Sequence, residues 1–102
     1  MRTVQSISGC AIRLSAERWG HIQEQHPELR GMLEAILSAV EQPDLVLAGN
    51  QGEFLGAKSV DPQKWLVVAY REDQVDGFVI TAFLTRRWRS LAKRRIVWQA
   101  SM

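Results

Sequence analysis

The sequence predicts a single α+β domain over residues 1–102, in which two N-terminal helices pack on a four-stranded antiparallel β-sheet. The length of 102 residues suits one hydrophobic core and is too short for two. Apolar residues recur at helical spacing before Pro43, and after it they form short runs separated by turn residues. Helices followed by a run of strands are typical of the α+β class.

The first helix is expected over residues 16–25. Ser15 is a good N-cap for it, and Leu14 can pack against Trp19 as a hydrophobic staple. Ahead of the helix, a short strand is expected over residues 11–14, and the remaining N-terminal residues form a lead-in.

The second helix is expected to begin at Pro27. Proline disfavours helical geometry at the preceding residue, His26, but is itself comfortable at the first helical position. The helix should end before Pro43, and its apolar face consists of Leu29, Met32, Leu33, Ile36, Leu37 and Val40.

Four strands are expected after the helices, joined by turns rich in glycine, proline and polar residues. They are residues 45–48, 53–60, 65–70 and 78–85. The tail from Arg86 onward is expected to form a short helix through Lys93 and then a strand over residues 95–98.

The net charge of +2 hides a strong asymmetry. Residues 86–95 carry six basic groups and no acidic one, which leaves seven basic and eleven acidic residues elsewhere. A cationic tract on an otherwise acidic chain favours a polyanion as partner. The alternative is a solvated helix face near the C-terminus.

The chain shows no apolar run of the roughly 20 residues that a membrane span needs. It also has no secretory signal pattern, and its single cysteine, Cys10, cannot form an internal disulfide. These features predict a cytoplasmic protein that does not act at a membrane.

Both histidines, His21 and His26, lie close together in the sequence, and histidine can exchange protons near neutral pH. Their spacing of five does not match the four-residue spacing of a zinc-binding helix, and no phosphate-binding glycine loop is present. We therefore expect no metal and no cofactor.

Metal-free RNA cleavage needs an acid–base group, cations for the phosphate charge and hydroxyl donors. His21 or His26 could supply the first, and Thr81 with Thr85 the last. In an extended strand Thr81, Phe83 and Thr85 share one face, opposite Ile80, so Phe83 could stack on a base. The candidate cations are Arg18, Lys58, Arg86, Arg87 and Arg89.

Each of these residues also has a structural alternative. His26 extends the apolar stripe of the first helix and could be bonded to backbone near Pro27, and His21 could be a plain surface residue. Thr81 and Thr85 are favourable strand residues in any sheet. The four tryptophans are more often core residues than base-stacking platforms.

Four short motifs, quoted in this sequence as Arg18-Trp19, His21-Ile22, His26-Pro27-Glu28 and Val79-Ile80-Thr81-Ala82-Phe83, resemble those of a known superfamily. It is the phage- and toxin-associated branch of the barnase–EndoU–colicin–RelE superfamily. Its members are small metal-independent RNases with N-terminal helices on a four-stranded antiparallel sheet, and the resemblance covers residues 12–98. It implies that the helix histidine of the family is His21 or His26, of which His26, before Pro-Glu, is the stronger match. Phe83 stands where tyrosine is common, so a hydroxyl donor is lost there.

The predicted function is therefore a metal-independent endoribonuclease-like domain, toxin- or prophage-associated, that cleaves RNA through 2′-hydroxyl attack. An antitoxin or immunity protein is the expected protein partner. The alternative is a non-catalytic RNA-binding or partner-binding module on the same scaffold. The predicted catalytic residues are His26, His21, Thr81 and Arg18, and the predicted RNA-binding residues are Lys58, Phe83, Thr85, Arg86, Arg87 and Arg89.

Overall fold

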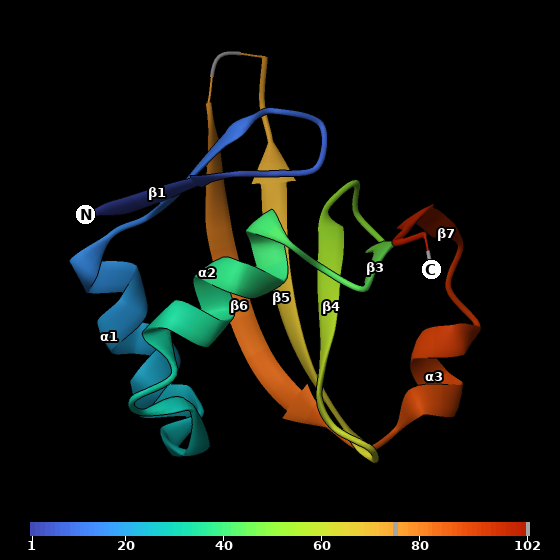
Figure 1. Cartoon of the computed structure of the whole chain (residues 1–102). Helices are drawn as coiled ribbons and strands as arrows, with labels where there is room; N and C mark the ends of the chain where they lie inside the picture. The colour runs from blue at the N-terminus through green and yellow to red at the C-terminus, as the bar shows by residue number, and fades with distance from the viewer. Residues whose placement is uncertain (75, 102) are drawn as a thin grey trace.

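The computed structural model describes residues 1–74 and 76–101, which form one seven-stranded mixed sheet with three short α-helices and one 3-10 helix (Figure 1). The strands are β1 (Arg2–Gln5), β2 (Ala11–Leu14), β3 (Leu45–Ala48), β4 (Phe54–Asp61), β5 (Lys64–Glu72), β6 (Gly77–Thr85) and β7 (Ile96–Gln99). The helices are α1 (Ala16–Gln25), the 3-10 helix η1 (Pro27–Leu29), α2 (Leu33–Glu41) and α3 (Trp88–Ala92).

The predicted fold, two helices on a four-stranded antiparallel sheet, is wrong in the size and topology of the sheet. The strand order is β1-β2-β6-β5-β4-β3-β7. The expected β3–β6 meander is present, but the β1–β2 hairpin joins one side of it and β7 joins the other. The β2–β6 pairing is parallel, with Ile12 opposite Gly77 and Arg13 opposite Phe78. Such pairings join residues far apart in the sequence, so local patterns do not reveal them.

Helix α1 has the predicted bounds, and its two ends explain why. The Ser15 side chain accepts a hydrogen bond from the Arg18 backbone N–H at 3.1 Å, as an N-cap does. At the other end the His26 N–H donates to the Ile22 carbonyl at 2.8 Å, and Pro27 follows. The Ser15 cap and Pro27 each act within a few residues, so the bounds of this helix can be predicted from the sequence.

The predicted second helix is divided in two. Pro27 begins η1 rather than a long helix, and Gly31 then adopts a φ of +81°, which interrupts the helical path. Helix α2 starts only at Leu33 and ends before Pro43 as expected. The apolar residues keep helical spacing on both sides of Gly31, and for this reason the sequence predicted one continuous helix.

Each face of the sheet has its own apolar cluster. On one face α1, η1 and α2 contribute Ile22, Leu29 and Ile36, among others, to a core that also contains Leu66, Val68 and Tyr70. On the opposite face Leu91 of α3 packs with a smaller cluster that contains Leu47, Leu55, Val67 and Ala69. We call these the helix face and the α3 face of the sheet.

Helix α2 approaches the sheet closely at Gly56 of β4. A Cβ atom at this position would lie 2.5 Å from the backbone oxygen of Ala39. The two backbones could not keep this separation with a larger residue, so glycine fixes how near α2 lies to the helix face.

Candidate nucleic-acid interface

The corner where β6 turns into α3 collects most of the basic tract. The Arg87 N–H donates a hydrogen bond of 3.0 Å to Thr85 Oγ1, which shapes the turn after β6. Helix α3 is only five residues long and is anchored by buried Leu91. Figure 1 shows it beside β7, at the other end of the sheet from α1.

Five cations of this corner are exposed and have no acidic neighbour within ion-pairing distance among the described residues. We call them the basic corner: Arg86, Arg87, Arg89, Lys93 and Arg95. Arg94, the sixth cation of the tract, has a structural role instead. Its Nη1 donates to Asn50 Oδ1 at 3.0 Å and to the Ala48 carbonyl at 3.5 Å, which joins the α3–β7 connection to the β3–β4 turn.

Three surface depressions meet at Arg86. The first, of about 460 Å³, is lined by Pro62, Gln63, Trp65, Arg86 and Trp88. The second, of about 340 Å³, adds Lys64, Leu84, Thr85 and Arg87. The third, of about 480 Å³, adds Arg89 and Ser90. One arginine thus borders a hollowed surface that combines cations with an exposed indole.

The predicted catalytic residues are not brought together. Thr81 lies opposite Ala69 in the β5–β6 pairing, and directly opposed residues share a face, so Thr81 is on the α3 face. His21 and His26 belong to α1 and its C-cap, which pack on the helix face. The sheet separates the histidines from the threonine, so these residues cannot act on a single phosphate.

Both histidines are surface residues with acidic neighbours. His21 has a side chain 56% exposed, and its Nε2 lies 4.0 Å from Glu17 Oε1. His26 is 33% exposed, and its Nδ1 lies 3.6 Å from Glu28 Oε2. Neither is enclosed in a cavity of the described structure, so their surroundings are those of ordinary surface histidines.

The other predicted RNA-binding residues divide between the two faces. Phe83 and Thr85 share the α3 face with Thr81, as strand alternation predicts, but Phe83 is partly buried against the small cluster. Ile80 was expected on the opposite face; a bulge leaves it unpaired and it packs on the α3 face too. Lys58 lies opposite Leu66 and so is on the helix face, where its Nζ donates to the Gln42 carbonyl at 2.7 Å. Lys58 therefore donates a hydrogen bond to the backbone carbonyl of the residue that ends α2, and it is not part of the basic corner.

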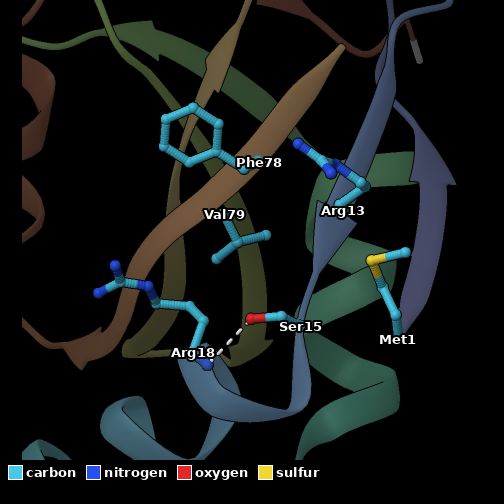
Figure 2. A pocket seen from close by; sticks show the side chains of 6 residues that line it. All are labelled: Met1, Arg13, Ser15, Arg18, Phe78 and Val79. Carbon is cyan, nitrogen blue, oxygen red and sulfur yellow. Dashed lines mark hydrogen bonds between the residues drawn. The ribbon is translucent and has the colours of Figure 1, made fainter.

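Arg18 lines a separate depression of about 250 Å³ (Figure 2). Figure 2 shows Arg13 pointing from β2 toward Phe78, and Arg18 extending from the start of α1 toward β6. Arg13 is neutralised by Asp76, with Nη2 3.0 Å from Oδ2. This second cationic hollow is smaller and less strongly charged than the basic corner.

Cys10 is a poor candidate for a nucleophile. Burial, followed by the charges of Glu72, Asp76 and Asp73, raises the pKa of its thiol. The reactive thiolate is therefore disfavoured at neutral pH.

The sequence interpretation missed the aromatic part of the corner. Trp65 and Trp88 stack with ring centroids 4.4 Å apart and planes at 18°, and Trp88 is 37% exposed. The available signal was the position of Trp88 between two arginines, where a core residue is not expected. Gln63 and Lys64 were missed because the β4–β5 turn and the start of β5 meet the residues that follow β6 only in the folded chain.

Within residues 1–74 and 76–101, no three His, Cys, Asp or Glu side chains form a group that could hold a metal ion, and no helix is long and apolar enough to cross a membrane. Comparisons with protein-family models, curated proteins and solved structures find no match for this chain.

Proposed function

We propose that this protein is an RNA-binding module and that the basic corner is its binding surface. The observation that carries the proposal is the group of five exposed cations without acidic neighbours among the described residues. Three of them, Arg86, Arg87 and Arg89, line the depressions that meet at Arg86. Phosphate groups would neutralise cations that the described part of the chain leaves unpaired. Arginine is suited to this because its planar guanidinium can bind two phosphate oxygens at once.

The charges elsewhere support the choice of this corner. Two cations of the β1–β2 hairpin face carboxylates: Arg2 Nη1 lies 2.6 Å from Glu34 Oε2, and Arg13 Nη2 lies 3.0 Å from Asp76 Oδ2. A polyanion that approached there would meet carboxylates as well as cations. The basic corner presents charge of one sign, which raises the association rate of an oppositely charged partner.

The test is the salt dependence of RNA affinity, measured by fluorescence anisotropy for the wild type and two double variants. We expect the slope of log Kd against log salt for a single-stranded RNA to drop by about 1.5 in Arg86→Gln/Arg89→Gln, since each lost phosphate contact removes roughly 0.7. The control, Arg2→Gln/Arg30→Gln, changes the net charge equally and should retain the wild-type slope. Equal slopes in all three proteins, or no RNA binding at low salt, would reject the proposal.

A second candidate function is metal-free cleavage of RNA at Arg18 and His21. The supporting observation is that Arg18 borders the depression of Figure 2. His21 is exposed and follows Arg18 by three residues, and residues at this spacing share one side of a helix. In this reaction the 2′-oxygen attacks phosphorus and its proton passes to a base. The bond to the 5′-oxygen breaks, and this oxygen takes up a proton from an acid or from water. The products are a 2′,3′-cyclic phosphate and a 5′-hydroxyl end.

Cleavage is tested with transfer and ribosomal RNA in excess chelator. The candidate predicts cyclic phosphate products, no cleavage of DNA, and a rate about two to four powers of ten lower in His21→Ala. His26→Ala, which changes the other surface histidine, is the matched control. Absence of products from the wild type, or equal rates in His21→Ala, would reject catalysis without affecting the binding proposal.

A further inference from the structure

We propose that the basic corner is specific for single-stranded RNA, because an unpaired base stacks on Trp88 in the depression lined by Pro62, Gln63, Trp65 and Arg86. This inference rests on the proposed RNA-binding function and adds the class of RNA. It is carried by the aromatic stack and the turn beside it rather than by the cations.

The stacked pair makes Trp88 a supported platform. Trp65 belongs to β5 and packs against the small cluster of the α3 face, so its position is set by the sheet. Trp88 lies on it at a centroid distance of 4.4 Å and an interplanar angle of 18°. Stacking on a ring that is already fixed costs little side-chain entropy on binding.

Trp88 is also reachable from more than one side. It lines both the depression with Pro62 and Gln63 and the one with Arg87, Arg89 and Ser90. With 37% of its surface exposed, it is one of the few large apolar side chains that the fold leaves in contact with water. A base that covered this surface would remove it from water, and every base has a face suited to such stacking.

Phosphate and base contacts are available on either side of the indole. Arg86 borders both depressions, where it can neutralise the phosphate that joins two successive nucleotides. Gln63 lies in the β4–β5 turn, which is held by its own N–H donating to Asp61 Oδ1 at 2.9 Å. Its side-chain amide makes no hydrogen bond to any described residue and lines the same depression, so it can donate to and accept from the edge of a base.

A duplex could not use this arrangement. In an RNA helix the bases are stacked on one another, and their faces are closed to an indole. A duplex would therefore contact only the cations, whereas a single strand would contact the cations and Trp88. The structure thus predicts a preference that depends on one aromatic residue.

The experiment compares one short RNA as a single strand and within a blunt duplex, at equal salt, by anisotropy and tryptophan fluorescence. We expect the wild type to bind the single strand at least about fivefold more tightly and to lose tryptophan emission on binding, as stacking of one base is worth a factor of about 5 to 160. Trp88→Ala should remove this preference while duplex affinity stays unchanged. Trp88→Phe, which keeps an aromatic face, should retain most of it.

The outcomes separate the two proposals. Binding of both RNA forms with equal affinity, or a preference that survives in Trp88→Ala, would overturn the single-strand inference and leave RNA binding intact. Failure of the wild type to bind either form would reject the proposed function itself. If Trp88→Ala does not fold, the inference is tested with the wild type and Trp88→Phe. A base stacked on Trp88 must quench the tryptophan emission of the wild type when the single strand binds, whereas the duplex should leave it unchanged.

Discussion

The two faces of the sheet differ in how thoroughly they are covered. The helix face buries side chains from α1, η1 and α2, and its cluster contains thirteen of the described residues, compared with seven on the α3 face. The α3 face receives one buried side chain, Leu91, from a five-residue helix. The first face stabilises the fold, while the second leaves arginines and an indole accessible to a ligand.

The charges differ in the same way. At the β1–β2 hairpin, Arg2 and Arg13 form ion pairs with Glu34 and Asp76, so their positive charge is neutralised. At the basic corner no such neighbour is present among the described residues. A cluster of charge that is left uncompensated raises the energy of the free protein slightly and is relieved by an anionic partner.

The largest expected effect is a difference in core stability. Ile36→Ala should lower the free energy of unfolding by about 2–5 kcal/mol, because it leaves a cavity at a fully buried position of the helix face. Leu91→Ala should cost about 2 kcal/mol or less, since the short helix around it can adjust. Urea unfolding measures both, and equal costs would contradict the idea that the α3 face is the weaker one.

Overpacking provides the next test. Gly56→Ala should lower the free energy of unfolding by about 1–3 kcal/mol, since the added methyl group would meet the Ala39 carbonyl of α2. Gly20→Ala in α1, where an added Cβ atom meets nothing within 4 Å, is the control and should not lower the stability. A neutral Gly56→Ala would show that α2 is free to move away from the sheet.

A smaller effect is expected where the α3–β7 connection meets the β3–β4 turn. Arg94→Gln removes the hydrogen bonds to Ala48 and Asn50 and should cost about 0.5–1.5 kcal/mol. Compared with the wild type, Arg94→Gln should exchange the backbone amide hydrogens of β7 faster, while those of β5 should exchange at an unchanged rate. Lys93→Gln, which removes the adjacent charge without these bonds, should leave exchange in β7 unchanged; equal acceleration in both variants would contradict the assigned role of Arg94.

The smallest effect appears only in alkali. Burial, followed by the charge of Glu72, raises the pKa of Tyr70 on the helix face. Above the ordinary tyrosine pKa of about 10 the unfolded chain releases this proton and the folded chain keeps it, so stability falls as pH rises. The part of the alkaline loss due to Tyr70 should vanish in Tyr70→Phe, as measured by denaturant midpoints from pH 8 to 11. Identical pH profiles would contradict this assignment.

Most helices and strands could be predicted from the sequence because interactions between residues close in the chain determine their bounds. Ser15 and Pro27 define α1 through a side-chain cap and a backbone restriction, each acting within a few residues. Strands β3 to β6 lie within a few residues of their predicted ranges because turn residues separate them. Strand alternation also placed Thr81, Phe83 and Thr85 on one face.

The sequence did not reveal how the sheet is completed. Strand β1 was missed because it has one apolar residue, Val4, and is held by pairing with β2 and by the Arg2–Glu34 ion pair. The parallel β2–β6 pairing and the β3–β7 pairing join segments more than forty residues apart. No local preference encodes such contacts; they arise when the whole chain buries its apolar faces.

The residues of the candidate site also come together partly through their positions in the sequence and partly through contacts between distant segments. The sequence by itself determined the basic tract, because six cations without an acid in ten residues are adjacent however the chain folds. Only the tertiary structure decided that the helices cover the face opposite Thr81, which separates it from His21 and His26. It also brought the Pro62–Gln63 turn and Trp65 against Trp88. Alternation determines which side chains of a strand share a face, but the choice of which face the helices cover depends on packing of the entire chain.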